Sequence, residues 1–337
     1  MNSASGLWIA NALVNFGVLA TISVGLNISF GMAGILDLSY FFSVAIGAYF
    51  GGVLALGGTN AALDLNHILG LSLPWPIAIL GGAVASGLLG LLVGLVALRR
   101  LRSDYLAIVL FAVWSIGYDI ISNTPSLFNG ITGLFNVPQP FGATSNPLTY
   151  PWVFLPIVAV VLGLLVLVAY ALERSGFGRT VRSVRDDSDL AEAMGKAVMS
   201  VRIRSMVVGC AYAGVAGALT IFYVGAYNPS AWFIFETIAA FAAVLIGGRG
   251  NVFGALIGAF IINGIASGVQ FIPTIAGRLD LTADFREALL ALVLMLVLYI
   301  RPHGVFRERL GTRTRDETTA DELSIESQPP LPIESVQ

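Results

Sequence analysis

The chain has 337 residues, of which 56% are hydrophobic and only 11% are charged, and its formal net charge is −2 at pH 7. Soluble domains carry about one quarter charged residues, so this composition excludes a soluble protein and indicates an integral membrane protein. The near-neutral charge predicts no nucleic-acid partner, and the single cysteine, Cys210, excludes an internal disulfide. The sequence contains no GxxxxGK[ST] phosphate loop, HExxH pair or CxxC pair, so we expect neither an enzyme nor a metal site.

Long apolar runs predict the membrane helices. A helix crosses the hydrocarbon core with about 20 apolar residues, because each residue adds only about 1.5 Å. The N-terminal residues lack the cationic leader and cleavage site of a secretory signal, so the first run is interpreted as a true span. The runs predict an all-α polytopic fold with about nine spans, within a range of eight to ten: residues 7–30, 35–57, 74–98, 105–122, 151–172, 206–226, 233–248, 252–272 and 285–300.

Basic residues predict the orientation, because cationic loops stay in the cytoplasm. Arginines and lysines cluster after the third, fifth, seventh and ninth predicted spans, whereas residues 58–73, 123–150 and 227–232 contain neither. This distribution predicts an N-terminus outside and a C-terminus in the cytoplasm.

The composition divides the chain into a transmembrane domain, residues 1–310, and a tail, residues 311–337. The tail is acidic and rich in Ser, Thr and Pro, with too few apolar residues to offset the entropy of ordering. We therefore predict that it is disordered and cytoplasmic. The largest polar connection inside the first domain is residues 173–204.

Two apolar segments carry glycine-rich breaks. They are "FGMAGILDLSYFFSVAIGAYFGG", residues 30–52, and "IGGRGNVFGALIGAFIINGI", residues 246–265. Transporters built from two related halves often interrupt corresponding helices near the substrate path. The segments therefore predict two pseudo-repeated halves, each with a glycine-broken hairpin. The alternative is that the glycines only let neighbouring helices pack closely.

Three acids, Asp37, Asp119 and Glu236, lie within or beside apolar runs. An ionised carboxylate at the bilayer centre costs at least about 2.5 kcal/mol, so it faces the bundle interior, a cavity or a partner. The alternatives are a solvated cytoplasmic turn between the first two spans or a cap of the second helix for Asp37, a solvated interface for Asp119 and a helix N-terminus for Glu236. Asparagines such as Asn11 and Asn15 are by default hydrogen-bonding links between helices. The candidates for a substrate pathway are Asn27, Asp37, Tyr40, Asp119, Asn123, Glu236 and Asn263.

The segment "DDSDLAEAMGKAV", residues 186–198, predicts a short capped helix. Asp187 or Ser188 can accept hydrogen bonds from the first free amides, and Gly195 would end or bend the helix. The residues that share its apolar face are Leu190, Ala193, Met194 and Ala197. This face either lies on the membrane surface or fills a groove on a partner, and composition leaves both open.

Several segments occur in a fixed order: "LRSDYLAIV" (101–109), "FGRTVRSVRDDSDLAEAMG" (177–195), "YAGVAGAL" (212–219), "VLIGGRGNVFGALIGA" (244–259) and "RPHGVF" (301–306). In this order they resemble the permease subunits of ABC transporters for branched-chain amino acids. In addition, "AEAMG" (191–195) is similar to the Glu-Ala-Ala and Gly pattern of the coupling loop in ABC importers. The resemblance covers most of residues 20–310, and this permease group also serves urea, short amides and other neutral amino acids.

The resemblance implies an ATP-driven importer in the plasma (inner) membrane of a prokaryote. It implies that this chain pairs with a second homologous permease, and that two cytoplasmic ATPase subunits hold the ATP and Mg while this chain binds no cofactor. An extracytoplasmic solute-binding protein would deliver a branched-chain or other small neutral amino acid, which crosses by alternating access. The residues implied in coupling to the ATPases are Arg185, Asp187, Leu190, Glu192, Ala193, Met194 and Gly195.

The chain departs from the family pattern at three places. "LDLSY" (36–40) replaces Leu-Asn/Ser-Leu-Gly-His, Ser115 and Tyr118 stand where a Glu and an Arg are common, and Glu236 precedes the usual acid by about one turn. These departures concern the solute more than the architecture. The rival functions are a self-contained secondary transporter or channel, with the intramembrane acids as proton or ion sites, and a non-transporting scaffold or receptor.

Overall fold

The structure is a computed structural model, and it describes residues 3–56, 71–99, 103–142, 149–232, 234–268 and 292. The described residues form helices joined by short connections, with no β-strand among them beyond one isolated bridge between Leu134 and Tyr227. The predicted all-helical class is confirmed for this part of the chain. The predicted ninth span, apart from Leu292, and the acidic tail lie outside the described residues.

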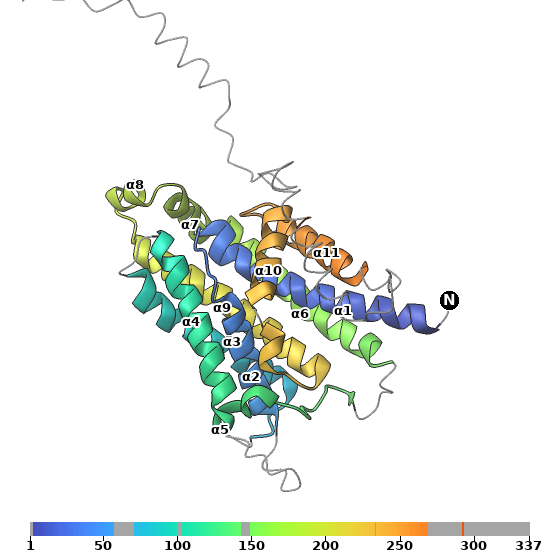
Figure 1. The fold of residues 1–337 in the computed structure, drawn as a ribbon. Helices are drawn as coiled ribbons and strands as arrows, with labels where there is room; N and C mark the ends of the chain where they lie inside the picture. The colour runs from blue at the N-terminus through green and yellow to red at the C-terminus, as the bar shows by residue number, and fades with distance from the viewer. Residues whose placement is uncertain are drawn as a thin grey trace, which may run out of the picture.

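The helices follow one another in a single bundle (Figure 1). They are α1 (Ser3–Leu26), its π-helical continuation η1 (Asn27–Met32), α2 (Tyr40–Ala55), α3 (Trp75–Val93) with its π-helical continuation η2 (Gly94–Leu98), α4 (Ser103–Asn123), α5 (Pro125–Phe128), η3 (Gly130–Thr132), α6 (Tyr150–Arg174), α7 (Gly176–Asp186), α8 (Ser188–Ala193), α9 (Val198–Val224), η5 (Pro229–Trp232), α10 (Ile234–Gly247) and α11 (Val252–Gly268).

The span count differs from the prediction. Within the described residues, six segments are long and apolar enough to cross a membrane: Gly6–Met32, Trp75–Leu98, Tyr105–Asn123, Tyr150–Arg174, Val198–Val224 and Pro229–Gly247. Two further apolar helices, α2 and α11, are shorter. Eight of the nine predicted runs therefore correspond to helices, of which six have full membrane length. The predicted orientation of the termini stays a prediction.

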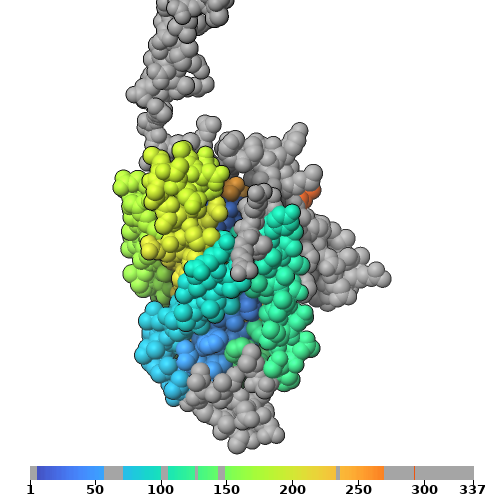
Figure 2. All heavy atoms as spheres, turned by 90° about the vertical axis from the view of Figure 1, so that its left-hand side faces the viewer, coloured from blue at the N-terminus to red at the C-terminus, as the bar shows by residue number. Residues whose placement is uncertain are grey.

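Lipid-facing surface is evident on α3 and α6. α3 and η2 expose Ile77, Leu80, Val84, Leu88, Leu92 and Val96 at intervals of three or four residues. α6 exposes Val160, Leu164, Leu167 and Val168 in the same way. In Figure 2, α3 and α4 cover the lower part of the face shown, below the yellow segments of α8 and α9, and part of α2 is visible between them. Contiguous apolar surface of this extent suits hydrocarbon rather than water, so the chain is a multi-pass membrane protein.

Helix α9 lies at the centre of the bundle, packed against α1, α2 and α3. Small residues permit this packing: an added Cβ at Gly47 would overlap the backbone of Gly214, and one at Gly82 would come within 2.6 Å of the Gly47 carbonyl oxygen. The buried Ser86 hydroxyl lies 2.8 Å from the carbonyl oxygen of Ser43 and 2.7 Å from that of Cys210. Backbone contact and a shared hydroxyl thus hold α2, α3 and α9 together.

The two ends of the bundle differ. α7 and α8 lie at one end, called here the α7 end, and α5 lies at the opposite end (Figure 1). Two glycine-containing turns face α7: the first glycine turn, residues 31–34, follows α1, and the second glycine turn, residues 248–251, joins α10 to α11. Both belong to the hairpins that the sequence predicts, and both contain glycine at positive φ, with +72° at Gly34 and +78° at Gly250.

The first predicted hairpin has an unexpected geometry, because residues 33–39 return into the bundle without forming helix. Tyr40, the first residue of α2, is fully buried, and its hydroxyl lies 3.2 Å from the carbonyl oxygen of Ile22. Ile22 stands ten residues before Met32, so the Tyr40 side chain at the start of α2 reaches well into the bundle from the α7 end. The second predicted span, residues 35–57, therefore starts later than its apolar run.

Candidate functional site

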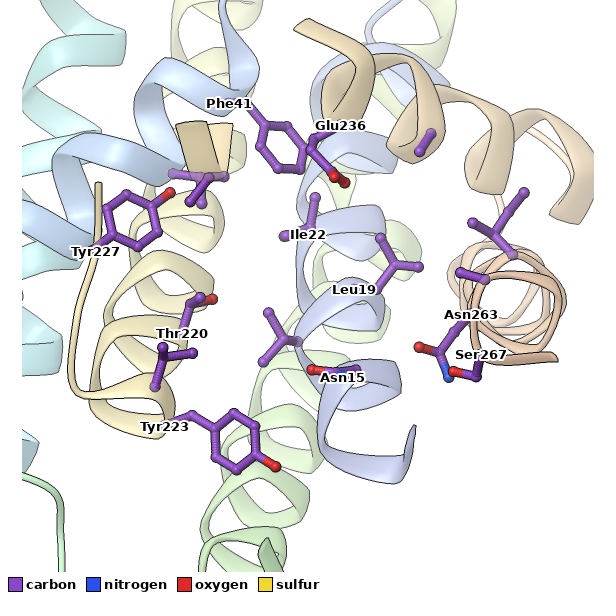
Figure 3. A pocket seen from close by; sticks show the side chains of 17 residues that line it. Asn15, Leu19, Ile22, Phe41, Thr220, Tyr223, Tyr227, Glu236, Asn263 and Ser267 are labelled. Carbon is purple, nitrogen blue, oxygen red and sulfur yellow. The ribbon is translucent and has the colours of Figure 1, made fainter. Parts of the chain in front are cut away.

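A cavity of about 370 Å³ lies between α1, α2, α9, α10 and α11. Its α1 residues run from Asn15 to Ile22 and its α9 residues from Thr220 to Val224, so it occupies the half of the bundle away from α7. The apolar wall includes Val18, Leu19, Ile22 and Phe41, and the polar lining includes Asn15, Thr220, Tyr223, Tyr227, Glu236 and Asn263 (Figure 3). The volume lies within the range of about 300 to 1,000 Å³ that is typical of small-molecule sites.

Glu236 is the only charged residue among the described residues that line the cavity. It lies in the first turn of α10, where the helix dipole stabilises a negative charge. Figure 3 shows its carboxylate beside the ring of Phe41, above Ile22 and Leu19 of α1. A carboxylate in an otherwise apolar and neutral lining attracts an ammonium group and disfavours an anion.

Neutral hydrogen-bonding groups lie farther along the cavity. Asn263 of α11 donates through Nδ2 to the carbonyl oxygen of Ala12, at 3.0 Å, and Asn15 lies on α1 opposite it (Figure 3). Burial raises the pKa of the Tyr227 phenol above its ordinary value, and the Glu236 carboxylate acts in the same direction. Tyr227 therefore stays protonated at neutral pH. The cavity combines one carboxylate, neutral polar groups and apolar walls.

The structure brings together two of the predicted pathway residues, Glu236 and Asn263. It adds Asn15, which the sequence suggests is only a link between helices, and Thr220, Tyr223 and Tyr227, which sequence reasoning missed. The pattern along any one helix offers no signal for these four, because they come from three different segments, α1, α9 and the connection after α9, that face one space. Asn15 is nevertheless polar inside an apolar run, which is the signal that identified Asn263.

Asn27, Asp37 and Tyr40 are fully buried outside the cavity lining. Asn27 accepts a hydrogen bond through Oδ1 from the backbone N–H of Gly250, at 2.9 Å. Asp37 accepts through Oδ1 from the backbone N–H of Ser39, at 3.0 Å, and from the Ser39 hydroxyl, at 2.6 Å. Asp37 thus bends the chain just before α2, and a solvated turn, one of the predicted alternatives for it, does not fit its complete burial.

Asp119 and Asn123 lie on the last turns of α4 and are exposed. Asn123 donates to the carbonyl oxygen of Asp119 at 2.9 Å, a bond within the helix. Neither residue lines the cavity. Their position agrees with the alternative of an interfacial acid.

The predicted cap of the short helix is confirmed. Asp187 accepts through Oδ1 from the N–H groups of Asp189 and Leu190, at 3.0 and 2.9 Å, and α8 follows at once. Gly195, at φ +78°, ends the segment. The apolar side chains of Leu190 and Met194 are 59% and 72% exposed, and Glu192 and Ala193 are exposed beside them. α8 therefore presents an uncovered apolar face at the α7 end.

A bundle of membrane-length helices around a partly polar cavity defines the class as a multi-pass membrane transport protein. The chain belongs to the family described as "Branched-chain amino acid transport system / permease component", whose sequence profile matches residues 8–298. The family is that of branched-chain amino acid ABC permeases.

Three relatives represent the similarity. The "Probable branched-chain amino acid transport permease protein LivM" of Methanocaldococcus jannaschii is 28% identical over 89% of this chain and 94% of its own length. The "High-affinity branched-chain amino acid transport system permease protein LivM" of Escherichia coli is 28% identical over 84% of this chain and 66% of its own length. The corresponding LivH protein of E. coli is 27% identical over 85% of this chain and 90% of its own length. No solved structure matches the chain.

Proposed function

We propose that this chain is the permease subunit of an ATP-driven importer that moves branched-chain or other small neutral amino acids across a prokaryotic plasma (inner) membrane. The observation that carries the proposal is the cavity, in which Glu236 faces apolar side chains of α1 and α2. An amino acid with an aliphatic side chain presents an ammonium group to a carboxylate and a hydrocarbon group to an apolar wall. The names of the relatives support the same class of solute.

The charge of Glu236 favours a zwitterion over urea or a short amide, which the same permease group also serves. Urea carries no cation to pair with the carboxylate, whereas an amino acid presents an ammonium group that can pair with it. Asn15, Asn263 and Tyr223 supply neutral hydrogen-bonding groups for the rest of the solute.

In this proposal, the cavity faces the outside of the cell and α7 and α8 face the cytoplasm. An extracytoplasmic binding protein delivers the solute, and a second, homologous permease completes the translocation path. The occurrence of both LivM and LivH relatives in E. coli supports a pair of permeases. Two ATPase subunits hydrolyse ATP with Mg, and this chain itself performs no catalysis.

The exposed face of α8 is the docking site for an ATPase subunit. A short helix with exposed Leu190 and Met194 fits a groove on a partner, as other amphipathic helices do. ATP-driven closure of the ATPases then moves α7 and α8 and opens the cavity toward the other side.

The proposed function is tested by uptake into proteoliposomes. The complex isolated with its native partners is expected to accumulate labelled leucine when ATP and Mg are present at the ATPase side. The chain alone is expected to accumulate none under a proton, sodium or potassium gradient. Gradient-driven uptake by the isolated chain would instead establish the rival function, a secondary transporter or channel.

A further inference from the structure

Two arginines of α7 each bind the backbone of one glycine turn. Arg185 donates through Nη1 to the carbonyl oxygen of Gly31, at 2.6 Å. Arg182 donates through Nη2 to the carbonyl oxygen of Gly250, at 3.2 Å. The two arginines are three positions apart and so share one face of α7. One helix therefore binds both turns, which lie more than 200 residues apart in the chain.

A third residue, Glu173, completes the arrangement from the last turns of α6. Its Oε1 accepts from Arg182 Nη2 at 2.8 Å, and its Oε2 lies 3.3 Å from the backbone nitrogen of Val252, the first residue of α11. The side chains of Arg182, Glu173 and Arg185 are 24%, 19% and 16% exposed. Hydrogen bonds to charged groups are among the strongest in proteins, and partial burial reduces their screening by salt.

The two glycine turns approach Arg185 and each other so closely that Gly31 and Gly34 have no room for a Cβ. A Cβ added at Gly34, whose φ is +72°, would lie 2.9 Å from Arg185 Cγ. A Cβ added at Gly31 would lie 2.8 Å from the nitrogen of Gly250. Any other residue at these two positions would push Arg185 away or separate the two turns.

The same turns continue into the helices that line the cavity. The first glycine turn leads from α1 toward α2, which contributes Phe41 and Val44 to the lining. The second joins α10, which carries Glu236, to α11, which carries Asn263. A displacement of α7 would therefore act on four of the five helices around the cavity.

α7 is also joined firmly to α8. Asp187 ends α7 and caps α8, so no flexible segment separates the two helices. Lys196 donates to the Ser183 hydroxyl at 2.8 Å, which ties the chain after α8 back to α7. Val184 of α7 and Ala191 of α8 are buried in the same cluster. α7 and α8 thus form one unit with an exposed apolar face on one side and two arginines on the other.

We propose that Arg182 and Arg185 are positioning residues that transmit the movement of α8 to both glycine turns, and that Glu173 holds Arg182 in place for this role. The inference rests on the proposed function, because it names the contacts by which a movement of the ATPase would pass from α7 and α8 to the helices around the cavity. The proposal concerns only Arg182, Arg185 and Glu173. It requires that ATP hydrolysis become uncoupled from uptake when the arginines lose their hydrogen bonds, although the subunits still assemble.

The test uses the complete transporter in proteoliposomes, with the R182Q and R185Q variants. Each is expected to lower the number of leucine molecules taken up per ATP hydrolysed by about tenfold, which corresponds to the loss of one charge-assisted hydrogen bond. The matched control is R179Q, because Arg179 lies exposed on the same helix and forms no side-chain hydrogen bond with the described residues. It removes the same charge and is expected to keep the ratio within about twofold of wild type.

A second readout follows the cavity itself. Ala266 lines it and becomes a reporter as Ala266→Cys, since the native Cys210 is buried and unreactive to a membrane-impermeant thiol reagent. In the otherwise wild-type complex, a non-hydrolysable ATP analogue is expected to change the labelling rate of this cysteine. In R182Q and R185Q the rate is expected to stay constant although the analogue still binds.

The outcomes separate the inference from the function. If the wild-type complex shows no ATP-driven uptake, the proposed function fails. If the wild-type complex transports leucine, and R182Q and R185Q show the same uptake per ATP hydrolysed and the same change in cysteine labelling, only the role of the two arginines is overturned. Should R185Q fail to assemble with its partners, R185K replaces it, because lysine keeps the charge but not the length and shape of the guanidinium. An intermediate ratio in R185K supports the proposal, and a wild-type ratio contradicts it.

Discussion

The side chain of Asn27 in η1 binds the second glycine turn directly, because its Oδ1 accepts a hydrogen bond from the backbone N–H of Gly250 at 2.9 Å. Asn27 is fully buried in η1, and the two residues are 223 positions apart. Arg249, beside Gly250, lies over the ring of Phe30, with its guanidinium carbon 4.4 Å from the ring centre. The two hairpins that the sequence marks by their glycines are therefore in contact at the α7 end.

This bond leads to a prediction about stability. Asn27→Ala leaves the buried N–H of Gly250 without its acceptor, which costs about 1 to 3 kcal/mol in the free energy of unfolding. We expect a lower midpoint of thermal unfolding for the detergent-solubilised complex, measured by a fluorescence melting assay. Asn123→Ala is the control, since Asn123 is exposed and bonds only within α4. Equal midpoints for the two variants would show that the bond contributes nothing.

A second prediction concerns the charge in the cavity. Glu236→Gln keeps the shape of the side chain and removes the charge that pairs with an ammonium group, so we expect the KM for uptake from the leucine-loaded binding protein to rise about tenfold. The measurement is initial uptake rate against concentration of solute-loaded binding protein in proteoliposomes.

Asp119→Asn provides the matched control for that experiment, because it makes the same change of charge at an exposed acid outside the cavity lining. We expect its uptake kinetics to equal those of wild type. A loss of uptake in Asp119→Asn similar to that in Glu236→Gln would move the path toward α4 and refute the cavity assignment.

A third prediction concerns docking at α8. Glu192→Lys reverses a charge beside the exposed apolar face, and Gly195→Trp places a large side chain where φ is +78° and the surrounding space is open. We expect both variants to hydrolyse ATP without uptake, or to lose the ATPase subunits on purification. The measurements are phosphate release, leucine uptake and subunit ratio on one preparation.

The control for α8 lies at the opposite end of the bundle. Ile131 is 75% exposed in η3, and Ile131→Ser is expected to leave ATPase association unchanged. If Glu192→Lys and Gly195→Trp both transport normally, α8 is not the coupling helix.

A fourth prediction compares two glycines. Gly34→Ala introduces a Cβ at φ +72° and 2.9 Å from Arg185 Cγ, so we expect strain in the first glycine turn and uptake reduced about tenfold. Gly163→Ala adds the same methyl group inside α6, where no heavy atom lies within 4 Å, and is expected to be neutral or slightly stabilising. Uptake by the two variants is compared at equal subunit content, and equal rates would contradict the role assigned to Gly34.

The sequence by itself determined the class of protein and the position of its helices. The apolar runs predict spans at residues 74–98 and 151–172, and the structure has α3 with η2 at residues 75–98 and α6 at residues 150–174. Asp187 predicts a cap and Gly195 the end of α8, because these signals depend only on local backbone geometry. The resemblance of ordered motifs likewise predicts the family.

Only the tertiary structure decided which polar residues meet. Hydropathy marks Asn15, Asn27 and Asp119 alike as polar groups in or near apolar runs. Packing places Asn15 at a cavity, Asn27 on the backbone of a distant turn and Asp119 on the exposed end of α4. The late start of α2 at Tyr40 has the same origin, because hydrogen bonds from buried side chains stabilise residues 33–39 outside a helix. Local hydropathy shows that burying a polar side chain in the membrane is unfavourable. The group that offsets this free-energy cost comes from a distant part of the chain, so only the tertiary structure identifies it.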